Sequence, residues 1–195
     1  MILIRVFLAL SIVILGPIAA IPASAAADPG DRPVTNALED KSCSVVNRAY
    51  ERSHNSGRFV FKVYQLMSTG ETDLYLESRV IDDYYYNKFG DGAWKRGSRL
   101  SIRTALNEKS HTPIFTLCSE VGAENFDGVP TVHWVANWSR RGWKASIDIW
   151  IDQTAGRFIK TISRYEPGFG EFHFPVALQT FDYDRDHAIK PTVSN

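Results

Sequence analysis

The sequence lacks the short motifs by which many enzyme active sites are recognised. It contains no GxSxG nucleophile elbow, no GxGxxG dinucleotide fingerprint and no phosphate-binding GxxxxGK[ST] loop. The sequence therefore carries none of the usual markers of acyl transfer, dinucleotide binding or nucleoside triphosphate hydrolysis. Five histidines are present, but none forms an HExxH motif or another close metal-binding pair. We predict no catalytic residue and no cofactor, and a hydrolase with an unrecognised site is the remaining enzymatic alternative.

Acidic residues repeat near the C-terminus, but the repeat lacks essential parts of a calcium loop. Asp182, Asp184 and Asp186 have the spacing of the first three ligands of such a loop. His187 occupies the sixth position, where the turn requires Gly, and Val193 occupies the twelfth, where a bidentate Glu is required. We therefore predict no metal site and interpret the repeat as a polar strand end.

The chain has no excess of charge of either sign. It contains 22 Lys and Arg residues and 22 Asp and Glu residues, so its bulk charge does not attract a polyanion. Aromatic residues, 12% of the chain, alternate along apolar stretches, which favours a β-rich core over base stacking, and we expect no nucleic-acid partner. A basic turn with Arg140, Arg141 and Lys144 is either a solvated hairpin tip or a contact for an anionic headgroup or an acidic partner.

Long apolar runs are also scarce, and the most apolar stretch stands at the start of the chain. Arg5 precedes an apolar run from Val6 to Leu15, and the small residues Ala23 to Ala25 follow. That run is too short to span a bilayer and has the layout of a cleavable secretory signal. We predict a signal peptide over 1–25, a flexible leader over 26–35 and a single domain over 36–191. The expected location is the periplasm or the exterior, with no stable membrane span, and an uncleaved anchor is the alternative.

Cysteine is scarce as well. Cys43 and Cys118 are the only two cysteines, and they form no CxxC pair. An even count in an exported chain predicts one disulfide, which would contribute about 4 kcal/mol by the chain-entropy estimate. Two buried thiols are the alternative.

The domain begins with one amphipathic helix and continues with strands. Asn36 and Glu39 have capping-box spacing, and apolar residues follow at helical period, which predicts a helix over 37–54 that ends before Gly57. From Gly57 onward apolar residues alternate at a period of 2, which predicts strands, and YYYNKFGDGAW predicts a hairpin with a strand around Trp94. The stretch 97–113 has no clear period and is either a short helix or a loop.

The strands that follow Phe115 are joined by short turns and should be antiparallel neighbours, because parallel crossovers need a dozen or more residues. The alternation also gives these strands one strongly apolar face. Seven or more strands of this kind present more apolar surface than one helix covers. The sheet therefore closes on itself or encloses a cavity.

Several stretches resemble the lipoprotein-carrier-like superfamily of bacteria, which includes the periplasmic lipoprotein carrier and the mycobacterial lipid-carrying lipoproteins. They are the helix that ends in SGRF, the YYYNKFGDGAW hairpin, ENFDGVPTVHWVANW, ASIDIWIDQTAGRFIKTISRY and the closing FPVALQTFDYDRDHAIKP. The resemblance spans about Asn36 to Pro191. It implies an α+β fold in which a long curved antiparallel sheet forms a half-open barrel packed around one or a few helices. It also implies a hydrophobic cavity that receives acyl chains.

The expected function is that of a periplasmic, non-enzymatic carrier or binding protein for a lipid or another hydrophobic ligand. The candidate ligand-binding residues share the apolar strand faces, and they are Phe61, Val63, Leu74, Leu76, Trp134, Trp138, Ile147, Ile149 and Ile151. Plain core packing is the alternative for each of them. The second hypothesis is a cell-envelope protein-interaction module with a self-filled core and no ligand. In that case outer aromatics such as Tyr85 and Trp150 would meet a transient envelope protein partner.

Overall fold

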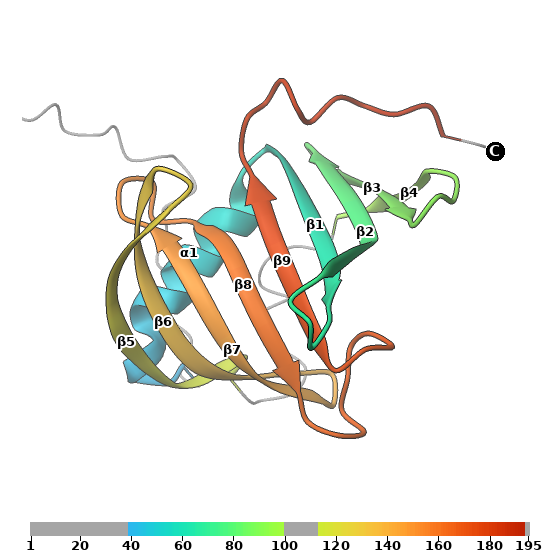
Figure 1. The fold of residues 1–195 in the computed structure, drawn as a ribbon. Helices are drawn as coiled ribbons and strands as arrows, with labels where there is room; N and C mark the ends of the chain where they lie inside the picture. Colours follow the sequence, from blue (N-terminus) through green and yellow to red (C-terminus); the bar gives the residue numbers. More distant parts are fainter. Residues whose placement is uncertain (1–38, 100–112, 194–195) are drawn as a thin grey trace, which may run out of the picture.

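The computed structural model describes residues 39–99 and 113–193, and it shows a nine-stranded antiparallel sheet with one α-helix (Figure 1). The predicted signal peptide, the leader and most of the stretch 97–113 lie outside the described residues. The elements in chain order are η1 Lys41–Cys43, α1 Ser44–Asn55, β1 Arg58–Leu66, β2 Thr72–Ile81, β3 Tyr84–Phe89, β4 Lys95–Ser98, β5 Phe115–Phe126, β6 Val129–Arg140, β7 Trp143–Asp152, β8 Phe158–Tyr165 and β9 Val176–Asp182.

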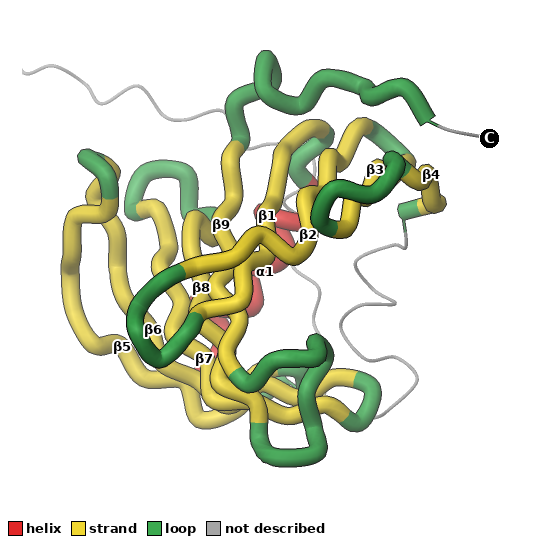
Figure 2. Tube along the Cα trace, turned by 45° about the vertical axis from the view of Figure 1, so that its right-hand side comes forward, coloured by secondary structure: helices red, strands yellow, loops and turns green. Residues whose placement is uncertain are grey.

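The sheet consists of two meanders joined by its last strand. Its order is β4-β3-β2-β1-β9-β8-β7-β6-β5, and β9 pairs with β1 on one side and with β8 on the other. The strands at the two ends of this order, β4 and β5, do not pair with each other, so the curved sheet remains open (Figure 2). The predicted α+β fold with a long curved antiparallel sheet around a helix is confirmed.

The helix begins later than predicted. Asp40 caps the short turn η1, because its carboxylate accepts a hydrogen bond from the Ser42 amide at 2.9 Å, and α1 starts only at Ser44. The Glu39 carboxylate accepts a hydrogen bond from the Asn47 side-chain amide at 2.9 Å. The predicted α-helix over 37–54 is therefore wrong at residues 39–43, while residues 36–38 lie outside the described residues.

The predicted disulfide is confirmed and fastens the start of the helix to the edge of the sheet. Cys43 and Cys118 are bonded with an S–S distance of 2.03 Å. Beside them, the Leu117 amide donates to Asp40 Oδ2 at 2.9 Å and the Cys118 amide donates to Ser42 Oγ at 3.1 Å. The register of the β5–β6 pairing shifts between Thr116 and Ser119. The side chains of Asp40 and Ser42 therefore bind amides that lie in this irregular part of β5.

Alternation located the strands well, since the four strands after residue 113 are antiparallel neighbours in the predicted order. One detail differs: Trp94 precedes β4 and does not lie within it. Among the helices that the structure describes, none has the length and apolar content needed to cross a membrane.

Candidate ligand cavity on the concave face of the sheet

Helix α1 covers only one half of the concave face. Its buried side chains, Val46, Ala49 and Tyr50, pack in one apolar cluster with Ile149 and Phe158 of the sheet. The main contacts of α1 are with η1, β5 and β8, while a second apolar cluster, which contains no residue of the helix, is built from β1, β2, β7, β8 and β9. A helix of 12 residues is too short to reach across all nine strands, and Figure 2 shows it lying behind one part of the sheet.

A cavity of about 420 Å³ lies on the concave face of the sheet, beside the part that α1 covers. Its volume is within the range of about 300–1,000 Å³ that is typical of small-molecule sites. Much of its wall is aromatic, and the rings come from the helix and from strands of both meanders: Tyr50, Phe59, Phe61, Phe115, Phe158 and Phe181. The sequence predicts more apolar strand surface than one helix can cover. In the structure, part of this surface surrounds a space that the described side chains leave open.

The nine predicted ligand-binding residues fall into two groups. Phe61, Leu76, Trp138 and Ile147 line the cavity. The others do not line it: Val63, Ile149 and Ile151 are at most 5% exposed, Trp134 packs against the cluster under the helix, and Leu74 is half-buried.

A bulge explains why Leu74 is separated from Leu76. The pairing of β1 with β2 shifts between Val63 and Tyr64, so that Val63 opposes Leu76 while Tyr64 opposes Leu74. Directly opposed residues lie on the same face of a sheet, and Val63 and Tyr64, as chain neighbours, lie on opposite faces. Leu74 is therefore on the face away from the cavity, whereas strict alternation placed it with Leu76.

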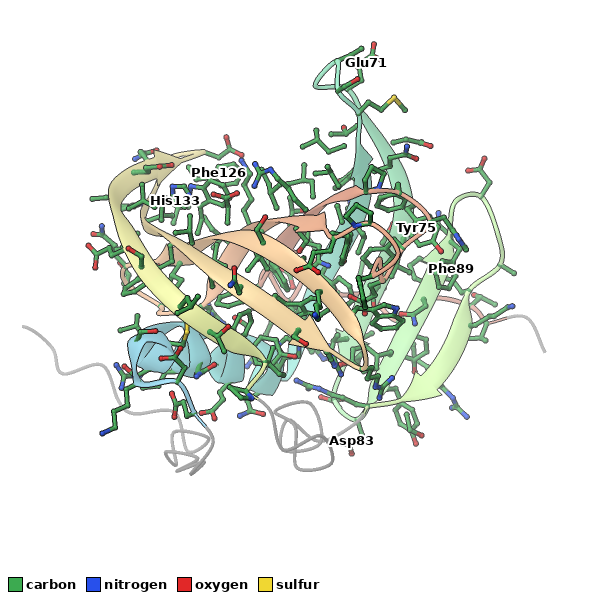
Figure 3. The ribbon with its side chains drawn as sticks, turned by 90° about the horizontal axis from the view of Figure 1, so that it is seen from below. Glu71, Tyr75, Asp83, Phe89, Phe126 and His133 are labelled. Atoms are coloured by element: carbon green, nitrogen blue, oxygen red, sulfur yellow. A yellow bond between two sulfur atoms is a disulfide. The ribbon has the colours of Figure 1, made fainter. Side chains whose placement is uncertain are left out.

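Tyr75, the residue in the bulge, packs against the connection between β8 and β9. Its ring lies 5.5 Å from that of Phe172 and 5.2 Å from that of Phe174, both edge to face. Figure 3 shows Tyr75 beside Phe89 on the β2–β3 side of the molecule, well away from Phe126 and His133. The bulge thus ties the first meander to the loop that bounds one end of the cavity.

Two ionisable residues of the cavity wall, the buried Tyr50 and the half-buried His54, come from the helix. The two rings lie 3.9 Å apart, and His54 Nδ1 is 3.0 Å from the carbonyl oxygen of Tyr50. Burial lowers the pKa of His54 to about 4 and raises the pKa of Tyr50 to about 12. Both side chains are therefore neutral at physiological pH and form a wall suited to an apolar chain.

Another part of the cavity wall is basic. Arg140 ends β6, and Arg141 with Gly142 forms a two-residue hairpin turn in which both residues have positive φ, 52° and 88°. The loop after β8 lies against this hairpin, because the Lys144 amide donates to the carbonyl of Phe169 at 3.1 Å. The same loop brings Glu171 into the cavity wall beside the two guanidinium groups.

Glu171 sits in a poorly hydrated position. Burial raises the pKa of its carboxyl, while the positive charges of Arg140 and Arg141 oppose that shift. Tyr165 is another residue of this wall. The basic turn was visible in the sequence, but Glu171 beside it was not, because residues 166–175 lack periodicity and their position depends on how the segments around them pack.

The wall also contains hydroxyl and amide groups between its rings. Thr161, Ser163 and Gln179 lie on β8 and β9, and all three line the cavity. Thr161 is 2% exposed, and its hydroxyl has no hydrogen-bond partner among the described residues. A buried hydroxyl without a partner is costly, and a ligand acceptor would relieve that cost.

Neither outer aromatic that sequence reasoning assigned to a partner surface is free for that role. Tyr85 lines the cavity, and Trp150 is 8% exposed. Trp150 stacks on His133 with ring centroids 4.3 Å apart and donates to the Glu124 carboxylate at 2.7 Å. His133 itself lies between two carboxylates, 2.9 Å from Glu124 and 2.9 Å from Asp148. The partner hypothesis thus loses both residues on which it was based.

Comparison with known proteins shows likeness in fold alone. No protein-family model matches the chain, and no curated protein matches it. Among solved structures, the chain is similar to the lipoprotein LppX of Mycobacterium tuberculosis at 12% identity and a TM-score of 0.45, with 78% of this chain and 98% of that chain covered. It is similar to LprF of Mycobacterium bovis at 10% identity and a TM-score of 0.43, covering 79% of this chain and 96% of that one.

A third likeness is to the MucA/MucB complex of Pseudomonas aeruginosa, at 14% identity and a TM-score of 0.40, covering 78% of this chain and 63% of that chain. These values describe a diffuse resemblance of architecture, in line with the resemblance seen in the sequence. They do not indicate what this chain binds, which depends on the residues of its own cavity.

Proposed function

We propose that the chain is a non-enzymatic carrier or binding protein of the bacterial cell envelope whose cavity holds a lipid or another apolar ligand. The observation that carries the proposal is the aromatic-lined cavity of about 420 Å³ on the part of the concave face that α1 leaves uncovered. A disulfide between Cys43 and Cys118 fits an oxidising compartment such as the periplasm or the exterior.

Binding of this kind needs no covalent chemistry. Each methylene that moves from water into an apolar wall contributes about 0.8 kcal/mol, so affinity should increase with chain length until the cavity is full. We assign the contact with the chain to Phe61, Leu76, Trp138 and Ile147. Val63, Ile149 and Ile151 support this wall from the core, and Trp134 supports it beside the helix.

Native mass spectrometry of the purified protein, followed by organic extraction, tests the proposal. A carrier should show discrete adduct masses, release lipid on extraction, and then take up tetradecanol in a one-to-one complex. Protein that carries no adduct and takes up neither tetradecanol nor tetradecanoate would refute the carrier function and favour an interaction module with a self-filled core.

A pair of variants on β9 shows whether uptake depends on the cavity. Gln179 lines the cavity, while its neighbour Thr180 faces the other side of the sheet. We expect Gln179→Trp to fill the space and abolish uptake, and Thr180→Trp to leave uptake unchanged. Equal uptake by both variants would place the ligand elsewhere. Circular dichroism establishes that both variants fold.

A further inference from the structure

The cavity wall combines neutral rings with positive charge. Tyr50 and His54 are neutral and packed against each other. Arg140 and Arg141 line the same wall, and Glu171 is the one acidic residue beside them among the described residues. A ligand in this cavity therefore meets both aromatic groups and an excess of positive charge.

Within the described residues, the two guanidinium groups have no ion-pair partner. Among residues 39–99 and 113–193, no carboxylate forms a salt bridge with Arg140 or Arg141. Glu171 acts on both only through its charge. Two positive charges thus face one negative charge at the edge of a poorly hydrated space, where electrostatic attraction is stronger than in water.

The position of this charge is fixed by the fold. The tight hairpin turn at Arg141 and Gly142 holds the end of β6, and the Lys144 amide bonded to the Phe169 carbonyl holds the loop that carries Glu171. Both connections lie at the same end of the sheet, as Figure 1 shows. The arginines therefore have a defined place relative to the aromatic wall, unlike cations on a free hairpin tip.

The geometry points to an amphiphile with an anionic headgroup, a carboxylate or a phosphate, as the ligand of this cavity. Its head would lie at Arg140 and Arg141, and its apolar chain would extend along the aromatic wall at Phe61 and Phe158. This inference rests on the carrier function proposed above. Guanidinium groups recognise carboxylate and phosphate oxygens by paired, charge-assisted hydrogen bonds, and they repel a cationic head.

Isothermal titration with four ligands of equal chain length tests the inference: tetradecanoate, tetradecyl phosphate, tetradecanol and tetradecyltrimethylammonium, all below the concentration at which they form micelles. We expect both anions to bind about ten- to a hundredfold more tightly than the alcohol, as one or two charge-assisted hydrogen bonds imply. The ammonium compound should bind more weakly than the alcohol. Tighter binding of tetradecanoate indicates a fatty acid as the natural source, and tighter binding of the phosphate indicates a phospholipid.

Charge variants show whether the arginines are responsible. Arg140→Gln and Arg141→Gln should each weaken the binding of the anions about tenfold and leave tetradecanol within about twofold. Glu171→Gln should act in the opposite direction and strengthen anion binding. Arg185→Gln, at an exposed position outside the cavity, is the matched control and should change neither ligand class.

The outcomes separate the two proposals. If none of the four compounds binds, the carrier function itself fails. If tetradecanol binds as tightly as both anions, and the arginine variants change the affinity for the alcohol and for the anions equally, the carrier function stands and the anionic headgroup is refuted.

Discussion

The hydroxyl of Ser53 links helix α1 to Phe158 at the start of β8. It donates to the carbonyl of Ala49 at 2.7 Å and accepts a hydrogen bond from the Phe158 amide at 2.8 Å, in a site where Ser53 is 1% exposed. The carbonyl of Phe158 accepts a further hydrogen bond from the Tyr183 hydroxyl at 2.7 Å. Both backbone groups of Phe158 thus depend on side chains, and the phenyl ring that lines the cavity is held by them.

Ser53→Ala should therefore destabilise the protein by about 1–3 kcal/mol, because it leaves the buried Phe158 amide without an acceptor. Urea unfolding followed by circular dichroism measures this change. Ser146→Ala is the control, since Ser146 is exposed on β7 and its loss should shift the free energy of unfolding by no more than about 0.5 kcal/mol. Equal effects of the two variants would show that the link to the helix carries no stability.

Loss of the disulfide should have a larger effect. The bond spans 75 positions of sequence, and a cross-link of that length is expected to contribute about 4 kcal/mol by restricting the unfolded chain. The double variant Cys43→Ala with Cys118→Ala should unfold at a lower urea concentration than the oxidised protein. Dithiothreitol should lower the midpoint of the oxidised protein and leave that of the variant unchanged. An oxidised protein that is insensitive to reductant would contradict this prediction.

Stability should fall in mild acid because of His54. The folded protein holds the pKa of His54 at about 4, against 6.5 when unperturbed, so between these values the unfolded state binds the additional proton. Stability is therefore complete above pH 6.5 and decreases as the pH falls toward 4, by about 2–3 kcal/mol in all. His54→Gln should flatten this part of the stability profile.

His187 provides a control of opposite sign. Its hydrogen bond with Asp182 raises the pKa of its imidazole, so protonation of His187 favours the folded state as the pH decreases. His187→Gln should therefore steepen the loss of stability in acid. An unchanged profile in His54→Gln would show that the His54 ring is hydrated in solution.

Enlarging the cavity should change the preferred length of the ligand chain. The Phe181 ring lines the cavity and lies 6.1 Å from that of Phe61 and 6.3 Å from that of Phe158. Phe181→Ala should cost about 3 kcal/mol of stability and shift the strongest binding to longer alcohols, as measured over a series of n-alkanols. Phe126→Ala, on the outer side of the sheet near His133 in Figure 3, should leave the length preference unchanged. The same optimum in both variants would exclude Phe181 from the ligand site.

Anion binding should strengthen as the pH decreases. Burial raises the pKa of Glu171, and the groups that face it are Arg140, Arg141 and Tyr165. Protonation of Glu171 removes the carboxylate that competes with the ligand for both guanidinium groups. The affinity for dodecylsulfonate, whose own charge does not titrate, should therefore rise as the pH falls toward the raised pKa of Glu171. Glu171→Gln should bind this ligand tightly at every pH at which the variant is folded, and a pH dependence that persists in the variant would assign the effect to another group.

The sheet and the disulfide could be predicted from the sequence, but only part of the cavity wall could. Strict alternation of apolar residues locates a strand and its buried face, and Trp138 and Ile147, which were chosen in this way, line the cavity. It fails at a bulge, where one extra residue reverses the faces, and Leu74 was misassigned for that reason. The aromatic wall was not predicted as a unit, because it includes Tyr50 from the helix and Phe158 from the first position of a strand.

The position of the charged residues in the cavity wall could not be predicted from the sequence, for a different reason. Arg140 and Arg141 are visible as a basic turn, but a turn alone does not show whether it faces solvent or a cavity. Glu171 lies in a loop without a periodic pattern. Its place beside the arginines results from contacts between segments that are separated in the chain, such as that of Lys144 with Phe169.

The position of β9 has a consequence for how the protein is made. A chain enters the folding compartment from its N-terminus, so residues 58–98 and 115–165 are both present before Val176 to Asp182 arrive. Until then the two meanders share no backbone pairing, because β1 and β8 meet only through β9. Helix α1 can already cover part of the second meander at that stage, but the inner apolar face of the first meander stays in contact with water until β9 pairs with β1.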